Sequence, residues 1–175
     1  MAKRSEQEVR AGLGAMMPRL WRYGMVLARR RDLADDLAQS TALRALEKAY
    51  QFRPGSRLDA WLFTIETSIW RNRLRAEKVR AGAGVIPIED ANLSDERPDT
   101  ETNILAREVL AKVMNLPEAQ RDAVFLAYVE GYAYREVAEI LEVPVGTVMS
   151  RLAAGRRKIN EALGEGAIAP GAQDG

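Results

Sequence analysis

The feature that most constrains the fold is a pair of short helices predicted between Tyr134 and Lys158. The segment YREVAEILEVPVGTVMSRLAAGRRK reads as an apolar-periodic helix, a break of three residues ending at Pro144, and a second helix with a basic end. Two short helices joined in this way form a helix-turn-helix, whose second helix is shaped to lie in the major groove of DNA. The segment therefore predicts promoter DNA as the first partner to consider.

The polar side chains of this pair suggest how DNA contacts are divided. Apolar positions are expected to pack the two helices together: Val137, Ala138, Ile140, Leu141, Val148 and Leu152. This leaves Thr147, Ser150 and Arg151 outward near the start of the second helix, the part that meets base edges. Arg156 and Arg157 lie further along, where cations suit phosphates. A plain helical hairpin with a solvated basic face is the alternative interpretation of this segment alone.

Composition excludes several classes of chemistry. The 175 residues include neither cysteine nor histidine, so disulfides, thiolate-bound metals and imidazole catalysis are excluded, and neither a metal nor a cofactor is expected. The first ten residues are charged and lack the apolar centre of a signal peptide. No run approaches the roughly 20 apolar residues that span a bilayer. We therefore expect a cytoplasmic protein without membrane insertion.

The periodicity predicts an all-α fold. Alanine and leucine recur at helical spacings along most of the chain, and alternating strand-like runs are missing. Pro18 fits the first turn of a first helix, and Asp32 the N-cap of a second helix reaching Tyr50. Ser56 and Asp59 are expected to start a third helix in the manner of a capping box. These three helices would form one small bundle.

A change of composition divides the chain into two helical domains. Residues 81–103 contain glycines, prolines and six acids against one arginine, with little helical periodicity, which is typical of a flexible linker. We therefore predict a first domain over residues 1–80 and a second over residues 104–164. The Gly/Ala/Pro-rich residues 165–175 are expected to be a disordered tail.

The third predicted helix carries a second nucleic-acid signal. Arg71, Arg75 and Lys78 are separated by four and three residues and share one face. Hydroxyl and aromatic side chains lie just upstream, and a basic groove beside such groups suits single-stranded or melted DNA. Alternatively, the arginines only solubilise the helix. We expect Trp61 in the core, whereas Trp70 fits either the core or the DNA face.

Asp35, Asp36 and Gln39 fall on one face of the second predicted helix. Three interpretations are open for them: metal ligands, a protein-docking patch and a solvated face. Metal catalysis with Asp32 as a further ligand is disfavoured, because adjacent aspartates diverge on a helix and no second ligand cluster is evident. Docking and solvation are both compatible with the residues alone.

Taken together, these residues resemble the extracytoplasmic-function sigma factors, a small two-domain group of bacterial transcription initiation subunits. The resemblance runs from about Met17 to Leu163. The stretch DLADDLAQSTALRALEKAYQFRPGSRLDAWLFTIETSIWRNRLR resembles region two of that family. The stretch LPEAQRDAVFLAYVEGYAYREVAEILEVPVGTVMSRL resembles region four. The two in this order are far more specific than a basic helix or a helix-turn-helix alone.

The resemblance implies a non-enzymatic factor that brings core RNA polymerase to promoters and helps to melt them. It implies that Asp36, Leu37 and Gln39 match the surface that docks on the polymerase clamp, which favours docking for the patch that also contains Asp35. It also implies that residues 52–58 and the start of the next helix hold an extruded base. Ser68 and Asn72 would contact melted bases, and region four would read the minus-thirty-five duplex and grip the polymerase flap. It also implies an anti-sigma factor as a partner.

Some positions depart from the family pattern, and two other functions compete. Ser68 replaces a common asparagine, and Met149, Ala153 and Ala154 stand where longer or basic side chains are frequent. Gly155 is expected to weaken its helix by about 1 kcal/mol relative to alanine. An operator-binding helix-turn-helix regulator that is not a polymerase subunit is the main alternative. A magnesium-dependent nuclease using the aspartates of the second helix is a weaker one.

Overall fold

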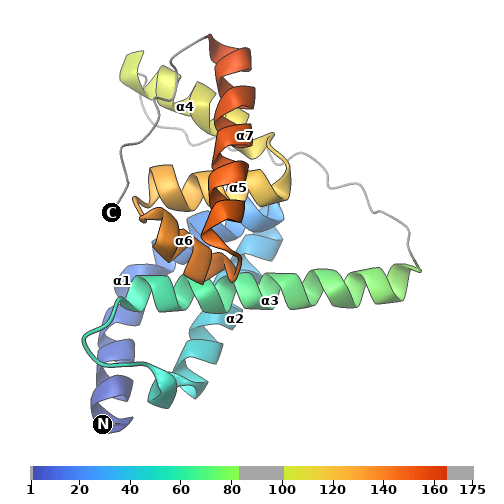
Figure 1. Ribbon diagram of the computed structural model, residues 1–175. Helices are drawn as coiled ribbons and strands as arrows, with labels where there is room; N and C mark the ends of the chain where they lie inside the picture. The colour runs from blue at the N-terminus through green and yellow to red at the C-terminus, as the bar shows by residue number, and fades with distance from the viewer. Residues whose placement is uncertain (1, 83–100, 165–175) are drawn as a thin grey trace. The chain divides into compact units, whose positions relative to one another are not determined.

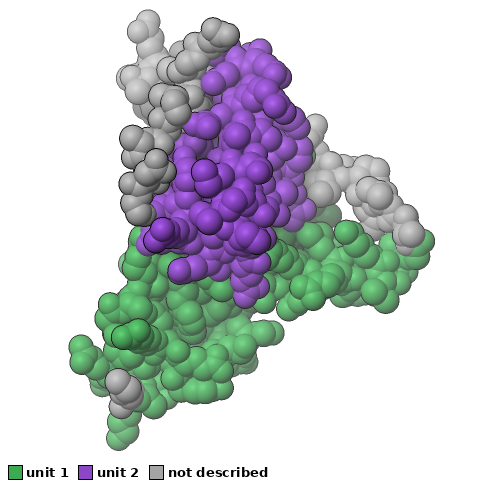
Figure 2. All heavy atoms as spheres, in the orientation of Figure 1, with its two compact units in different colours: residues 1–90 green, residues 91–175 purple. Residues whose placement is uncertain are grey.

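Helical periodicity along the chain produces a fold made of helices. The computed structural model describes residues 2–82 and 101–164, and every regular element within these ranges is a helix (Figure 1). The chain divides into two compact units, Met1–Asp90 and Ala91–Gly175 (Figure 2). The predicted all-α, two-domain organisation is therefore confirmed. Most of the predicted acidic linker and all of the predicted tail lie outside the described residues.

Unit 1 contains three long helices and one short turn. They are α1 (Ala2–Ala28), α2 (Arg31–Glu47), the 3-10 turn η1 (Ala49–Gln51) and α3 (Leu58–Ala81). Leu20, Leu37 and Leu62 bring one fully buried leucine from each long helix into the core. Tyr23 packs edge-on against Phe63 with ring centroids 5.0 Å apart. All three helices therefore share one core, and the C-terminal part of α3 extends beyond α1 and α2 (Figure 1).

The first helix begins much earlier than predicted. Pro18 lies inside α1 rather than in its first turn. Proline there removes one backbone hydrogen bond, to the carbonyl of Gly14, and Gly14 is exposed to water. Val9 and Leu13, one turn apart upstream of the proline, are buried in the unit. Burial of this apolar stripe outweighs the cost of the proline, so the N-terminal residues belong to the helix.

The predicted helix starts at Asp32 and Ser56 were both wrong. The N-cap of α2 is Arg30, and Asp32 lies in the first turn with its carboxylate 2.7 Å from the Arg30 guanidinium. That hydrogen bond lowers the pKa of Asp32. The Ser56 hydroxyl donates to the carbonyl of Arg53 at 2.6 Å instead of capping α3. Both side chains therefore bond to neighbouring residues, and α2 and α3 begin without a side-chain cap at Arg30 and Arg57.

Asp59 holds the start of α3 through charge rather than through a capping box. Its carboxylate lies 3.1 Å from the guanidinium of Arg19 in α1 and 3.0 Å from that of Arg57. It also accepts a hydrogen bond from the N–H of Ala60. The acid near the positive end of the helix and its two arginines tie α3 to α1.

Unit 2 contains the predicted helix-turn-helix. Its elements are α4 (Glu101–Met114), α5 (Glu118–Val124), the π-helical turn η2 (Phe125–Val129), α6 (Tyr134–Leu141) and α7 (Val145–Leu163). Helix α4 begins three residues before the predicted domain start at Ile104. Glu142 adopts a left-handed conformation with φ of 50°, which ends α6 and turns the chain into α7. The three-residue break predicted before α7 is confirmed.

Gly155 has a packing role that the sequence interpretation missed. A Cβ atom at this position would lie 2.8 Å from Cγ2 of Val124 in α5 and 3.5 Å from a methyl group of Leu116. The absent side chain lets α7 approach α5 closely. The cost of glycine to helix stability is therefore offset by the close packing of α7 against α5.

A large side chain at Gly155 is expected to separate α7 from α5. Gly155→Leu should lower the free energy of unfolding of unit 2 by about 3 kcal/mol, because overpacking forces neighbouring side chains out of position. Ala153→Leu, two residues earlier on an exposed surface, should change it by less than about 0.5 kcal/mol. Hydrogen exchange of α5 and α7 peptides measures both effects. Equal protection in the two variants would show that the close approach is unimportant.

Within the described ranges, no helix is both long enough and apolar enough to cross a lipid bilayer.

Candidate nucleic-acid interface

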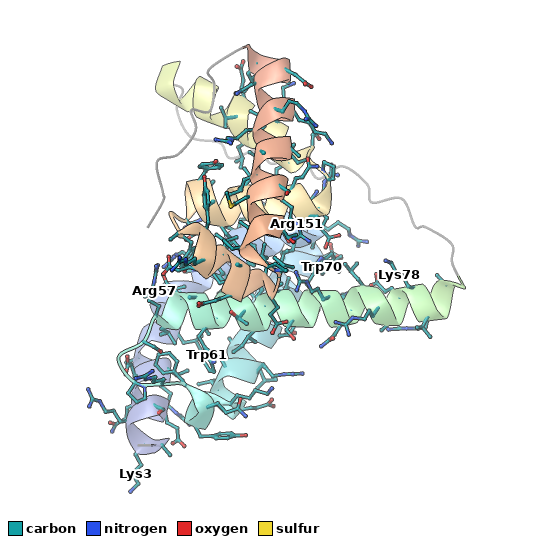
Figure 3. All side chains as sticks on the ribbon, viewed as in Figure 1. Lys3, Arg57, Trp61, Trp70, Lys78 and Arg151 are labelled. Atoms are coloured by element: carbon teal, nitrogen blue, oxygen red, sulfur yellow. The ribbon has the colours of Figure 1, made fainter. Side chains whose placement is uncertain are left out.

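One face of α3 collects the residues predicted to contact melted DNA. Positions 61, 64, 68, 71, 75 and 78 follow one another at steps of three or four residues and therefore lie on the same side of the helix. Arg75, Lys78 and Asn72 are exposed, while Ser68 and Arg71 are half-buried. Figure 3 labels Trp61 near the start of α3 and Lys78 near its C-terminal end. We call the side of α3 that carries these positions the α3 face. The predicted residues are thus brought together.

The structure places Trp70 in one of its two expected positions, whereas the position expected for Trp61 was wrong. Trp70 is a core residue, 3% exposed, so it cannot stack on a base. Trp61, expected in the core, is half-buried and packs against Phe52 with ring centroids 5.2 Å apart. Trp61 therefore supplies the aromatic ring of the α3 face. It also connects that face to the loop of residues 52–58.

The loop before α3 is held by contacts from α1. The backbone N–H of Gly55 lies 3.2 Å from both carboxylate oxygens of Glu8. Gly55 has a φ of 79°, a left-handed conformation that glycine adopts without steric cost. Because Glu8 belongs to the part of α1 that the sequence did not predict, this anchor could not be anticipated. It positions the loop at the start of the α3 face.

The acidic patch of α2 is exposed but engaged by neighbouring helices. Trp21 Nε1 donates to Asp35 at 2.6 Å, and the Arg73 guanidinium lies 2.9 Å from Asp36. Gln39 is exposed one turn further along. Among the residues that the structure describes, no three acidic side chains are grouped so that they could hold a metal ion. The patch is therefore part of the solvent-facing surface of α2, with two of its acids fixed in place.

An apolar strip continues this patch and was missed in the sequence. Leu43 and Leu46 follow Gln39 at four and seven residues, so they share its helix face. They are 61% and 40% exposed, and Tyr50 beyond them is 61% exposed. Large apolar side chains left exposed side by side are typical of a protein-binding surface. The spacing of four and seven residues from Gln39 is the signal in the sequence that identifies them.

The outward surface of α7 is built mainly from small side chains. Ser150 is exposed, and its hydroxyl donates to the carbonyl of Gly146 at 3.0 Å. Thr147 and Arg151 are half-buried on this surface, and Arg151 is labelled in Figure 3. Met149, 52% exposed, is its largest apolar group. Close approach to a groove is therefore possible along the first turns of α7.

The basic residues further along α7 differ in their surroundings. Arg157 is exposed, with its guanidinium 3.9 Å from Glu161 one turn away. Arg156 is half-buried and lies beside the hydroxyl group of Tyr128. A weak surface ion pair such as that of Arg157 leaves its charge available to other anions. Both arginines can therefore meet phosphates, but only Arg156 is held in place by an aromatic neighbour.

Comparison with known proteins places both units in one family. The family of sigma-70 region 2 matches residues 14–80, and that of sigma-70 region 4 matches residues 106–159. The chain is 34% identical over 154 residues to the ECF RNA polymerase sigma factor EcfG of Rhodopseudomonas palustris strain TIE-1, covering 85% of this chain and 81% of that protein. It is 30% identical over 148 residues to the RNA polymerase sigma factor CarQ of Myxococcus xanthus, covering 85% and 84% of the two chains.

A solved structure agrees with these matches. The sigma factor RpoE of Bartonella quintana, crystallised with the anti-sigma factor NepR, resembles this chain with a TM-score of 0.74 and 26% identity. The similarity covers 91% of this chain and 99% of that one. The order of the two matched regions, the identity to curated relatives and the shared fold lead to one conclusion. The protein belongs to the extracytoplasmic-function RNA polymerase sigma factors.

Proposed function

We propose that unit 1 docks on core RNA polymerase and holds the melted minus-ten strand, while unit 2 reads the minus-thirty-five duplex. The observation that carries this proposal is the continuous α3 face, because its exposed cations, polar groups and Trp61 match the needs of an unstacked strand. The polymerase, and not this chain, would carry the catalysis. The chain would direct where that catalysis begins.

The docking surface on core polymerase would be the exposed side of α2. It combines the carboxylates of Asp35 and Asp36 and the amide of Gln39 with the apolar strip of Leu43 and Leu46. An apolar centre beside polar groups is the usual composition of a protein interface. Trp21 and Arg73 hold the two carboxylates in fixed positions, which reduces the entropy lost on docking.

The α3 face would bind the melted strand. Arg71, Arg75 and Lys78 would lie along the phosphates, while Ser68 and Asn72 would contact bases. The loop of residues 52–58, anchored by Glu8, lies next to Trp61 and would receive an extruded base. A serine at position 68 offers one hydroxyl in place of an amide, so fewer hydrogen bonds to that base are expected.

The helix-turn-helix would read the upstream duplex through the start of α7. Thr147 and Arg151 are four residues apart and so lie one turn apart on the same side of α7, where they can reach base edges. The Ser150 hydroxyl donates its hydrogen to Gly146, which leaves it to act as an acceptor. Few long polar side chains are present, so DNA shape would contribute to the choice of site.

An anti-sigma factor is the expected regulator. The similar sigma factor of Bartonella quintana was crystallised with the anti-sigma factor NepR, and a second structure of the same fold contains CnrH with the cytosolic domain of CnrY. We propose that a protein of this class binds the present chain. Its obvious target is the apolar strip of α2, since a partner seated there would block the polymerase surface.

Core association separates this proposal from an operator-binding regulator. We expect the chain to co-elute with purified core polymerase, and Asp36→Ala/Gln39→Ala to weaken that complex at least about tenfold. A regulator that is not a polymerase subunit would bind DNA without core, and the double variant would leave that binding intact.

Arg73→Gln is the matched control for the docking variant. It breaks the same ion pair as Asp36→Ala but leaves the carboxylate of Asp36 on the surface. We expect it to bind core polymerase within about twofold of the wild type. A loss equal to that of the double variant would mean that the ion pair, and not the docking surface, matters.

A further inference from the structure

A cluster of three side chains in unit 2 joins Arg156 to two tyrosines that lie outside the surfaces described above. Tyr128 of η2, Tyr134 at the start of α6 and Arg156 of α7 meet at one place on the unit. The two hydroxyl oxygens are 3.5 Å apart, and the Arg156 guanidinium lies beside that of Tyr128. All three residues are half-buried. We call this group the tyrosine–arginine cluster.

The backbone brings the cluster together by two local departures from a regular helix. The π-helical turn buries Phe125, Leu126 and Ala127 and leaves Tyr128 partly exposed at the end of α5. Gly131, with φ of 76°, then turns the chain so that α6 begins at Tyr134. Such π-helical turns are frequent at functional sites. The geometry therefore places two hydroxyl groups side by side at a helix start.

Arg156 joins the cluster because its neighbour in sequence is fixed. Gly155 is buried against Val124 of α5, so the next residue of α7 emerges at the edge of that contact. The nearby carboxylate of Glu136 accepts a hydrogen bond from the N–H of Ala133 at 2.9 Å. Glu136, the acidic residue nearest to Tyr134 in the sequence, is therefore hydrogen-bonded to the backbone at the start of α6.

The cluster presents hydrogen-bond donors. Burial and the hydrogen bond with Tyr134 raise the pKa of Tyr128 to about 12, an effect that the charge and hydrogen bond of Arg156 oppose in part. The Tyr128 hydroxyl therefore keeps its proton at neutral pH. One of the two hydroxyl protons is used in the hydrogen bond between the tyrosines, so one hydroxyl and the guanidinium remain as donors, which suits a phosphate oxygen.

The place of the cluster along α7 fits the edge of a DNA groove. Met149 and Arg156 are separated by seven residues, two helical turns, and so lie on one edge of the helix. At a rise of about 1.5 Å per residue they are roughly 10 Å apart along the axis. The major groove is about 12 Å wide. With the start of α7 among base edges, Arg156 reaches a strand that borders the groove.

We propose that Tyr128, Tyr134 and Arg156 together bind one backbone phosphate of duplex DNA. This assignment rests on the proposed DNA-reading role of unit 2 and adds two tyrosines to its contacts. The phosphate would fix the register of α7 in the groove, since backbone contacts position a protein without selecting sequence. The tyrosine pair would orient the phosphate through a hydrogen bond, and the guanidinium would attract it by its charge.

The test uses polymerase assembled with the full chain and a duplex that this complex selects from a random library. Tyr134→Phe is expected to weaken binding about tenfold without changing the salt dependence, because it removes a neutral donor to a charged group. Arg156→Gln should weaken binding and reduce the slope of log affinity against log salt by about 0.9. Arg156→Lys keeps the charge and should restore that slope.

Single neutral methylphosphonates along the duplex locate the phosphate. One position should cost the wild-type complex about tenfold in affinity and cost the Arg156→Gln complex almost nothing, because the contact is already lost. Lys3→Gln, at an exposed residue of α1 in unit 1, removes the same charge as Arg156→Gln and should leave the scan unchanged. Hydrogen exchange of α5 and α7 peptides checks that each variant is folded.

The possible outcomes separate the cluster from the function on which it rests. If the wild-type complex selects no duplex, the proposed function fails. If it selects one and the three cluster variants bind with wild-type affinity, slope and methylphosphonate pattern, the phosphate site is wrong while the DNA-reading role stands. A methylphosphonate effect that persists unchanged in Arg156→Gln would likewise overturn the assignment.

Discussion

Replacing Arg71, Arg75 and Lys78 together with glutamine is expected to weaken binding of melted promoter DNA about a hundredfold at roughly 0.1 M salt. Each cation that neutralises a single-strand phosphate contributes about 0.7 to the slope of log affinity against log salt, so the slope should fall by about 2. The measurement is the affinity of the assembled polymerase for a fork-junction DNA with a single-stranded minus-ten segment, taken across a salt series.

A second triple variant separates the effect of where the cations lie from the effect of the net charge of the protein. Lys3, Arg4 and Arg10 are exposed cations of α1 in the same unit, and replacing them with glutamine makes the same change in charge. We expect that variant to keep its affinity within about threefold and its slope within about 0.5. Equal losses in the two triple variants would show that the α3 face has no special part in binding the strand.

Glu66→Gln is expected to change how the stability of unit 1 depends on pH. Glu66 is fully buried, and among the residues that the structure describes neither of its carboxylate oxygens has a hydrogen-bond partner. Burial raises the pKa of Glu66 well above its usual value of 4.5. The native chain therefore keeps this proton over a pH range in which the unfolded chain has released it.

The sign of the effect follows from proton binding. Stability is complete below pH 4.5, where both states are protonated, and falls as pH rises toward the raised pKa. Within that window the wild type should lose about 1.4 kcal/mol per pH unit relative to Glu66→Gln, which cannot ionise. Urea unfolding followed by tryptophan fluorescence measures this, because the three tryptophans Trp21, Trp61 and Trp70 all belong to unit 1.

Glu77→Gln provides the comparison for Glu66. Glu77 is on the same helix, but its side chain is 43% exposed and lies 3.3 Å from Arg73. Because this side chain is partly exposed and paired with an arginine, we expect the Glu77→Gln variant to follow the pH dependence of the wild type. If Glu66→Gln also followed it, the carboxyl of Glu66 would have to be solvated or paired in the folded protein.

Much of the fold could be predicted from periodicity and from residues with strong local preferences. The apolar spacing of Val137, Ile140 and Leu141, followed by Pro144, fixes the helix-turn-helix because it depends on neighbours in sequence. Local patterns were less informative at helix starts. Arg19 and Arg57 determine how α3 begins through contact with Asp59, and an arginine distant in sequence carries no signal in a capping pattern.

The candidate site divides in the same way. The α3 face follows from spacing alone, and the structure brings its cations together as expected. Which tryptophan is buried could not be predicted, since both fit an amphipathic helix: Trp70, left open between core and DNA face, is buried, and Trp61, expected in the core, is half-buried. The partners of Asp36 and Gly155 are likewise set by helices distant in sequence.

Transcription by purified core polymerase, with sequencing of the 5′ ends of the products, tests the sigma-factor role most directly. With this chain added, we expect transcripts from a genomic DNA pool to begin at a limited set of sites that share upstream and minus-ten motifs. Without it, those starts should be absent. The same start sites at the same abundance with and without the chain would contradict a role in promoter selection.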